Sequence, residues 1–400
     1  MILKLVFKIT IYLAITCFIE IASANAALEP PQQPVDYYPV STKTNPYMKL
    51  AEKLAAIPEK KLDLASAKLQ LEKAMWPKID VQKYLSRIDQ IAEEVKNYSG
   101  GTKDPEQRIR HMNTYFYKYL GFDYNKNPDL VLSSDLKVSA LSTLLDSKQG
   151  TCFSLPLLYM VIAQRLGWPI KMVAAPRHLF IRYVDPRLKQ QNIEATGYGG
   201  YTSDEEYIRD LKITPLALEK GTYMRTLTNR EVLGAMIGDY ASHWIHKIVK
   251  SKNNVLWMQE LARSIQLQHL SIKLYPIGEL EYINMGNRYN DLAIFGRKIF
   301  DLEWAGFPKE RINANVLELM NQDMAAIRFH SAQAQRWYGI ARSLGVREAD
   351  FTPEAKQEMR EDMVKHQINA ESLHQQFEIE RQQMIERLKK NRKSGELKRL

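Results

Sequence analysis

The pattern of apolar and polar positions predicts a chain that is mostly helical with one short region of strands. Apolar residues recur at helical spacing from about Met48 to Val95, with interruptions near Pro58 and Pro77. From about residue 212 onward the pattern is again almost wholly helical. Between these parts, short apolar runs with alternating faces predict strands. We therefore expect an α+β domain followed by an all-α region.

The clearest helix in the pattern extends from Cys152 to Leu166, and Gly167 follows it as a stop signal. Proline is tolerated only near the first turn of a helix. Because Pro156 lies in this segment, the regular helix must begin near Cys152. The apolar positions that define this helix recur at helical spacing: Leu155, Leu158, Tyr159 and Ile162.

A second helix is predicted upstream of this one. Asp104 is a good N-cap, because a proline follows at the first helical position and Gln107 follows three residues after the cap. We expect this helix to reach about Leu120 and to end at Gly121. The next residues, up to Leu136, lack periodicity and predict a loop.

Short strands are predicted after the helix that begins at Cys152. On the second of them, Phe180 shares the face of His178, because side chains alternate along a strand. Ser203 then predicts another helix start, since it is followed by three acidic residues. The three strands are expected at Ile170–Ala174, His178–Val184 and Asn192–Thr196.

The N-terminus has the pattern of a secretory signal peptide. Lys4 and Lys8 precede an apolar run from Ile9 to Ile19, and Ala24-Asn25-Ala26 supplies a small-x-small end. The apolar run is too short for a comfortable membrane span. We expect removal of residues 1–26 on export to the periplasm, with an uncleaved N-terminal anchor as the alternative.

Composition and charge narrow the classes of partner. Apolar residues make up 45% of the chain, which supports a real core, and the net charge is +10. Without residues 1–26 it is about +9, because they hold two lysines and Glu20. No nucleic-acid-binding motif is visible, so nucleic acid is not expected as a partner. The basic tail, Lys389–Lys393, predicts at most peripheral contact with a membrane surface.

Cysteine usage points to a candidate nucleophile. The chain has two cysteines, and Cys17 lies in the expected signal peptide. Cys152 is then the one cysteine of the exported chain and can form no internal disulfide. A single cysteine with a histidine and an acid downstream is a candidate for nucleophilic catalysis. A helix N-terminus also favours the thiolate, which attacks acyl groups far better than the thiol.

The remaining roles can be assigned to residues near the predicted strands. His178 can accept the thiol proton and deliver it to a leaving amine. Glu194 can hold the imidazole in the correct tautomer, and Asn192 shares its strand face as the alternative. The backbone N–H of Cys152 is the natural first oxyanion donor, with Gln149 as a candidate side-chain donor.

Alternatives for these residues stay open at the level of sequence. A cysteine at a helix start is often packed and inert, and a histidine that begins a strand is often structural. His243 and His246 lie three residues apart, but no third ligand has the right spacing for zinc. We therefore expect no metal site and no cofactor.

Several segments together resemble the transglutaminase-like superfamily, and its bacterial SirB1-related branch most closely. The nucleophile block is Leu141–Pro169, which contains Gly150-Thr151-Cys152-Phe153-Ser154-Leu155-Pro156. The histidine block is Pro176–Arg182. Asn192–Thr196, with the glycine pair at 199–200 and Ser203–Tyr207, resembles the strand that carries the third residue and its turn. The resemblance covers roughly residues 100–210.

The resemblance implies a papain-like fold with a Cys-His-acid triad. By position, Cys152 and His178 would be nucleophile and base, and Glu194 stands where the family often has aspartate. Attached helical repeats are common in this branch, and Leu267–Tyr289 resembles one degenerate tetratricopeptide unit. The expected division is a signal peptide at 1–26, a lead-in with helices at 27–99, the transglutaminase-like domain at 100–211, and a helical region with the basic tail at 212–400.

The leading functional prediction is cysteine-dependent acyl chemistry on an amide of a protein or peptide substrate, such as an envelope component. Hydrolysis is favoured over transfer, because water is the default acyl acceptor. The alternative is a catalytically inactive transglutaminase-like scaffold that binds a partner through its helical C-terminal half. The sequence does not determine the oligomeric state.

Overall fold

The computed structural model describes residues 45–127, 135–249 and 254–347. All of them belong to one compact unit, Val40–Leu400. The expected signal peptide, residues 27–44 of the lead-in and the basic tail lie outside the described residues. None of the described helices is long and apolar enough to span a membrane.

The N-terminal helices follow the predicted breaks at proline. Asp63 and Asp80 act as N-caps, because each carboxylate accepts hydrogen bonds from backbone N–H groups of the helix that follows. The elements are α2 (Pro46–Ala55), a 3-10 turn (Glu59–Lys61), α3 (Leu64–Met75) and α4 (Val81–Ser99). Their buried faces form one side of the main core.

The helix predicted to start after Asp104 is present but changes type before its end. Asp104 caps α5 (Pro105–Asn113), which continues as a π-helical turn, η4 (Thr114–Tyr119). Gly121 follows with φ +73°, in the left-handed region that favours glycine. The π-helical turn has no sequence signal, and such turns often occur at functional sites.

The predicted loop between Gly121 and Leu136 is wrong at one point. Strand β1 (Asp123–Tyr124) pairs in parallel with β2 (Gln149–Gly150), so that Tyr124 is opposite Gly150. Strands of two residues carry no detectable periodicity, which explains the error. Between them, the described chain contains a 3-10 turn (Leu136–Ser139) and α7 (Leu141–Ser147).

The helix predicted at Cys152 is α8 (Ser154–Arg165), and it begins two residues later than expected. Pro156 occupies its first turn, as the stereochemistry of proline requires. The first ten residues of α8, from Ser154 to Ala163, are buried. The helix therefore crosses the interior of the domain, with Cys152 just before its N-terminus.

The three strands form one antiparallel sheet in the order β3-β4-β5. They are β3 (Ile170–Ala175), β4 (His178–Tyr183) and β5 (Asn192–Ile193). On the other edge of β3, Met224 and Leu227 donate backbone hydrogen bonds to Ala174 and Met172. The segment that leads into the C-terminal helices is therefore bonded to the sheet that carries His178.

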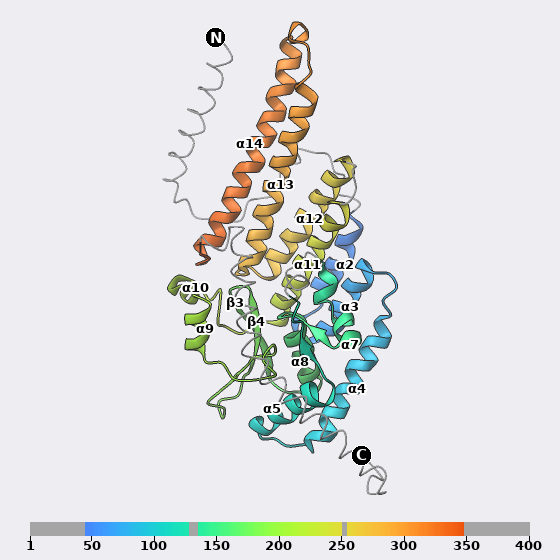
Figure 1. Cartoon of the computed structure of the whole chain (residues 1–400), viewed down its shortest axis with the longest axis vertical. Helices are drawn as coiled ribbons and strands as arrows, with labels where there is room; N and C mark the ends of the chain where they lie inside the picture. The colour runs from blue at the N-terminus through green and yellow to red at the C-terminus, as the bar shows by residue number, and fades with distance from the viewer. Residues whose placement is uncertain (1–44, 128–134, 250–253, 348–400) are drawn as a thin grey trace. The chain divides into compact units, whose positions relative to one another are not determined.

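The C-terminal half is helical, as the sequence predicts. Ser203 forms a full capping box with Glu206 at the start of α9. The helices are α9 (Asp204–Asp210), α10 (Pro215–Lys220), α11 (Asn229–Val249), α12 (Asn254–Leu274), α13 (Glu279–Trp304) and α14 (Ala314–Ser343), with a 3-10 turn at Lys309–Arg311. Helices α13 and α14 form a long antiparallel hairpin (Figure 1). Whether α12 and α13 are a tetratricopeptide-like pair stays a prediction.

Two hydrophobic clusters organise these elements. The main cluster extends from α2 to α12 and includes Leu233 and Ile237 of α11 as well as Leu267 of α12. The second cluster joins α12 to the hairpin, with Trp337 fully buried at its centre. Helices α11 and α12 thus share a core with the strands and with α8. The division at residue 212 stays a prediction.

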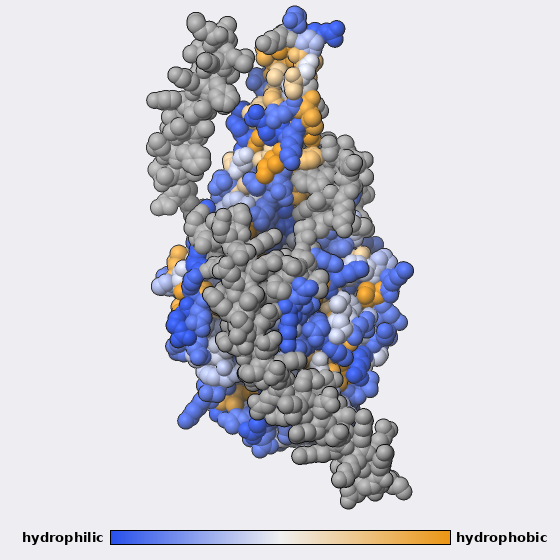
Figure 2. All heavy atoms as spheres, in the orientation of Figure 1, coloured by the Kyte–Doolittle hydropathy of each residue, from blue (hydrophilic) through white to orange (hydrophobic). Residues whose placement is uncertain are grey.

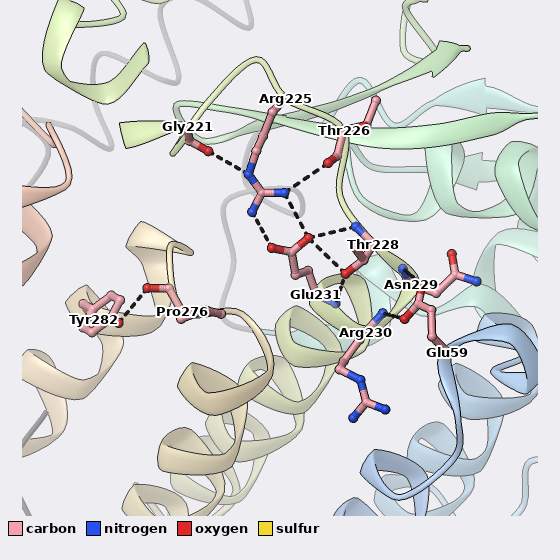
Figure 3. A network of polar contacts seen from close by, with 10 residues as sticks. All are labelled: Glu59, Gly221, Arg225, Thr226, Thr228, Asn229, Arg230, Glu231, Pro276 and Tyr282. Carbon is pink, nitrogen blue, oxygen red and sulfur yellow. Dashed lines mark hydrogen bonds and ion pairs between the residues drawn. The ribbon is translucent and has the colours of Figure 1, made fainter. Parts of the chain in front are cut away.

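A polar network also ties α11 to the rest of the fold (Figure 3). Arg225 donates to the carbonyl oxygens of Gly221 and Thr226, and it pairs with Glu231 of α11. Glu59 accepts from the backbone N–H groups of residues 229 and 230, at 2.8 and 2.9 Å. A carboxylate at this position complements the free N–H groups and dipole of the helix N-terminus.

Candidate active site

Cys152 lies in a turn that Thr151 fixes at the start of α8. The Thr151 side chain accepts from the backbone N–H of Phe153 and of Ser154, both at 3.3 Å. In return, the Ser154 hydroxyl accepts from the Thr151 N–H at 2.9 Å. Thr151 thus acts as the N-cap in place of a residue nearer the helix. Cys152 is partly exposed at this end of α8.

Gly150 is required by close packing at the same turn. A Cβ atom at this position would lie 2.7 Å from Leu155 Cγ and 2.9 Å from Leu144 Cδ1. Both neighbours are fully buried, so neither can move aside cheaply. The glycine therefore lets β2 approach α7 and α8 closely, and this approach positions the turn that bears Cys152.

His178 begins β4 after a tight turn formed by Pro176 and Arg177. Ala175 and His178 are paired in the ladder, so the turn has two residues. Arg177 has φ +56°, a left-handed conformation that costs a residue with a side chain about 1–2 kcal/mol. The Arg177 carbonyl oxygen accepts from the Cys152 thiol at 4.0 Å. The strained turn thus contacts the thiol directly.

The structure brings Cys152, His178 and Glu194 into one site. Nε2 of His178 lies 2.7 Å from Oε2 of Glu194, and the Cys152 thiol contacts the carbonyl oxygen of Arg177, the residue before His178. Since Nε2 faces the carboxylate, Nδ1 is the nitrogen left for the thiol. The side chains of His178 and Glu194 retain 19% and 15% of their exposure, so the pair is shielded but reachable.

Glu194 is held by groups from its own turn and from α9. Its Oε1 accepts from the Thr196 N–H at 2.9 Å and from the Thr196 hydroxyl at 2.6 Å. Its Oε2 accepts from the Tyr207 hydroxyl at 2.7 Å. The Tyr207 ring in turn stacks on Phe180 with 4.1 Å between centroids. These bonds leave the carboxylate little freedom to turn away from His178.

The charges of this pair reinforce each other. Burial lowers the pKa of His178, but the Glu194 carboxylate and the hydrogen bond with Cys152 outweigh it and raise that pKa to about 10. Burial raises the pKa of Glu194, whereas His178, Thr196 and Tyr207 together lower it to about 2. At neutral pH the arrangement is an imidazolium beside a carboxylate.

The two auxiliary candidates lie in different surroundings. Asn192 accepts from Arg182 Nε at 2.7 Å and donates to Asp204 at 2.7 Å, so it joins β5 to β4 and α9 and does not bond His178. The backbone of Gln149 lies in β2, and among the described residues no hydrogen bond of its side chain occurs.

Sequence reasoning missed three residues at the site: Tyr124, Thr196 and Tyr207. Tyr124 is paired with Gly150, two residues before Cys152, and burial chiefly raises its pKa, with a further rise from the charges of Cys152 and Glu194. The two supports of Glu194 could have been suspected from their positions beside the predicted acid. Tyr124 had no such signal, because it lies in a strand of two residues.

His243 of α11 is not part of a cluster of possible metal ligands within the described residues. Among residues 45–127, 135–249 and 254–347, no group of His, Cys, Asp and Glu side chains could hold a metal ion. His243 packs edge-on against Trp76 and Trp244.

Comparison with known proteins agrees with this geometry at the level of the superfamily. Residues 82–238 match a family model described as the transglutaminase-like superfamily. The matched segment extends from α4 into α11 and contains Cys152, His178 and Glu194. No curated protein matches the chain. The chain therefore contains a transglutaminase-like domain that includes the start of α11.

Proposed function

We propose that this chain performs cysteine-dependent acyl chemistry on amides, with Cys152 as nucleophile, His178 as base and acid, and Glu194 as the group that orients His178. The observation that carries the proposal is the 2.7 Å bond between His178 and Glu194, beside a thiol that contacts the turn from which His178 begins its strand. An inert packed cysteine needs no such partners, whereas a nucleophile needs both.

In the first half-reaction, Cys152 has already given its proton to His178, and the thiolate Sγ attacks the carbonyl carbon of the amide. The π electrons of the C=O bond move to oxygen, which becomes an oxyanion. When the tetrahedral intermediate collapses, the C–N bond breaks and the amine leaves with the proton of His178. The product on the protein is a thioester of Cys152.

In the second half-reaction, His178 accepts a proton from water while the water oxygen attacks the thioester carbon. The C–S bond then breaks, and the thiolate leaves beside His178, which keeps the proton that it took from water. The bonds from Thr196 and Tyr207 to Glu194 support both halves, because they hold the carboxylate against the imidazole throughout. The longer side chain of glutamate, where the family often has aspartate, still makes a 2.7 Å contact.

Hydrolysis is proposed over transfer to an amine, with a protein or peptide of the cell envelope as the substrate. The signal-peptide pattern of residues 1–26 supports a periplasmic location, and the basic tail supports peripheral contact with a membrane surface. We further propose membership of the SirB1-related branch, supported by the order of the cysteine, histidine and acid segments. The α12–α13 pair is proposed as a degenerate tetratricopeptide unit, supported by the spacing within Leu267–Tyr289.

A second candidate, an inactive scaffold, is supported by a different observation. The far end of the α13–α14 hairpin exposes a group of apolar side chains, visible in Figure 2 as the orange region at that end. Near this end of α13 and α14, the exposed apolar side chains include Leu302, Leu317 and Leu319, with Leu302 78% exposed. Exposed apolar patches often mark interaction surfaces. In this account, Cys152 and His178 would be structural.

Cleavage of a pool of peptide aminocoumarin amides separates the two candidates. The enzyme account predicts fluorophore release by the wild-type chain, loss to background in Cys152→Ala, and an acyl group on Cys152 in trapped protein by mass spectrometry. Adding a primary amine such as dansylcadaverine tests transfer, since hydrolysis predicts free acid rather than labelled amide. Equal release by wild type and Cys152→Ala would leave the scaffold account in place.

A further inference from the structure

Tyr124 lies at the site through backbone pairing rather than through side-chain packing alone. In the β1–β2 ladder, Asp123 donates to Lys148 O and Asn125 donates to Gly150 O, both at 2.8 Å. This places Tyr124 opposite Gly150, two residues before Cys152. In parallel strands, paired residues project to the same side. The backbone thus fixes Tyr124 beside the segment that leads into Cys152.

The polar end of Tyr124 has no partner within the described part of the chain. Its ring packs against the main core and is half-buried. Yet its hydroxyl makes no hydrogen bond among the described residues and is not fully enclosed. A tyrosine that packs against a core usually finds a partner for its hydroxyl. The hydroxyl is therefore available to a bound molecule.

The Tyr124 hydroxyl stays protonated at neutral pH. Burial chiefly raises the pKa of Tyr124, and the charges of Cys152 and Glu194 raise it further, so the phenol is able to donate. The hydroxyl of Tyr117, in the π-helical turn, donates to the Ala195 carbonyl oxygen at 3.0 Å. Of these two tyrosines, only Tyr124 has a hydroxyl that donates to no group among the described residues.

We propose that the Tyr124 hydroxyl is a catalytic hydrogen-bond donor to the acyl oxygen of the substrate, beside the backbone N–H of Cys152. This inference rests on the proposed acyl chemistry. It assigns to Tyr124 the side-chain role that the sequence offered to Gln149.

The role concerns charge that exists only in the tetrahedral intermediate. As the Sγ–C bond forms, the π electrons of the carbonyl move to oxygen, and the Tyr124 O–H donates to that oxygen without giving up its proton. When the C–N bond breaks, the electrons return and the hydrogen bond weakens. Donors aimed at developing charge typically contribute about 100- to 1,000-fold in rate. A side-chain donor that remains partly exposed is expected near the lower value.

Two reactions of the same thiol distinguish this role from a structural one. Acylation by p-nitrophenyl acetate passes through an oxyanion, whereas alkylation by iodoacetamide displaces iodide and develops none. The experiment compares the full chain with Tyr124→Phe and corrects both for Cys152→Ala background. The matched control is Tyr282→Phe, which removes another phenolic hydroxyl, one that donates to Pro276 O at 2.7 Å in the second cluster.

We expect Tyr124→Phe to slow acylation about 100-fold while alkylation of Cys152 changes less than twofold. Tyr282→Phe should change neither rate. Unchanged acylation in Tyr124→Phe would overturn the role of Tyr124 and leave the proposed function intact. An equal loss of both reactions would also overturn it, because the residue would then only shape the thiol environment. A wild-type chain that is never acylated above background would overturn the proposed function and this inference with it.

Discussion

At the scale of single residues, Glu194 is the side chain with the largest effect on the protonation of His178 in the candidate site. Its carboxylate is the strongest influence that favours the protonated form of His178, and four groups fix it in place. An imidazolium beside a thiol favours the thiolate, which is the reactive form. The reactivity of Cys152 should therefore depend on Glu194, although no contact between their side chains is needed.

The titration of His178 tests this dependence. Its pKa is raised to about 10, so in the wild-type chain the imidazole should stay protonated from pH 6.5 to beyond pH 9. Glu194→Gln removes the negative charge that raises this pKa, so His178 should lose its proton at a lower pH. The measurement is the 15N shift of the His178 ring across a pH series.

Asn192→Ala provides the control for that series. Asn192 bonds Arg182 and Asp204 rather than His178, so its loss should leave the midpoint nearly unchanged. The same midpoint in wild type and Glu194→Gln would contradict the assignment of Glu194 as the partner of His178.

At the scale of elements, local signals made part of the site predictable. Pro156 limits where α8 can begin, and the alternation around Phe180 identifies the strand that His178 starts. The capping residues Asp104 and Ser203 mark helix starts through short-range hydrogen bonds. Such features depend on neighbours in sequence, so the sequence alone contains them.

Other elements depend on contacts between distant residues and could not be predicted. The pairing of Tyr124 with Gly150 joins segments 26 residues apart through strands that are too short to show a period. The π-helical turn after Asn113 likewise has no pattern of its own. Asn192 bonds Arg182 and Asp204 rather than His178, because the register of the ladder pairs Asn192 with Arg182.

The close approach of β2 to α8 predicts that a side chain at Gly150 destabilises the fold. Gly150→Ala should destabilise the fold by about 1–3 kcal/mol, because its methyl group would overlap Leu155 and Leu144. It should also slow alkylation of Cys152, since the turn that bears the thiol must shift. The measurements are urea unfolding and the rate of reaction with iodoacetamide.

A glycine without such neighbours is the control. Gly339 in α14 has no atom within 4 Å of an added Cβ. Gly339→Ala should stabilise the chain by about 0.5–1 kcal/mol through its helix propensity. If both substitutions had the same effect, close packing at Gly150 would not be the cause.

At the scale of the whole molecule, the C-terminal helices are joined to the domain at both ends. Helices α11 and α12 share the main core. The end of α14 returns to α10, where Thr214 and Thr222 donate to the carbonyl oxygens of Gly345 and Leu344, each at 2.7 Å. The hairpin therefore leaves the domain and comes back to it.

Truncated chains test whether the C-terminal helices support the fold of the domain or form a separate layer. A chain that ends at Val249 loses Leu267, Leu274 and Tyr275 from the main core, so we expect it to lose cooperative unfolding. Removal of residues 298–324 with a short turn in their place removes no member of either cluster. That shortened hairpin should unfold cooperatively, with a midpoint close to that of the full chain.

Calorimetry of both chains is the measurement. A chain ending at Val249 that folds and retains cleavage of a small amide would contradict the shared core and support the division at residue 212. Loss of folding in the chain with the shortened hairpin would show instead that the far end of the hairpin is structural.

The most direct test of the central claim is the reactivity of Cys152 in the folded chain. Iodoacetamide labelling at pH 7 is followed on the Cys152 peptide by mass spectrometry in wild type, His178→Ala and Glu194→Gln, with the unfolded chain as reference. An ordinary cysteine is only a few per cent thiolate at this pH, so a thiolate paired with His178 should react roughly tenfold faster or more. We predict that Cys152 of the wild type is labelled faster than that of the unfolded chain by that factor. In His178→Ala the labelling rate should fall to that of the unfolded chain or below, and in Glu194→Gln it should lie between the two. Equal rates in wild type and His178→Ala would contradict the account.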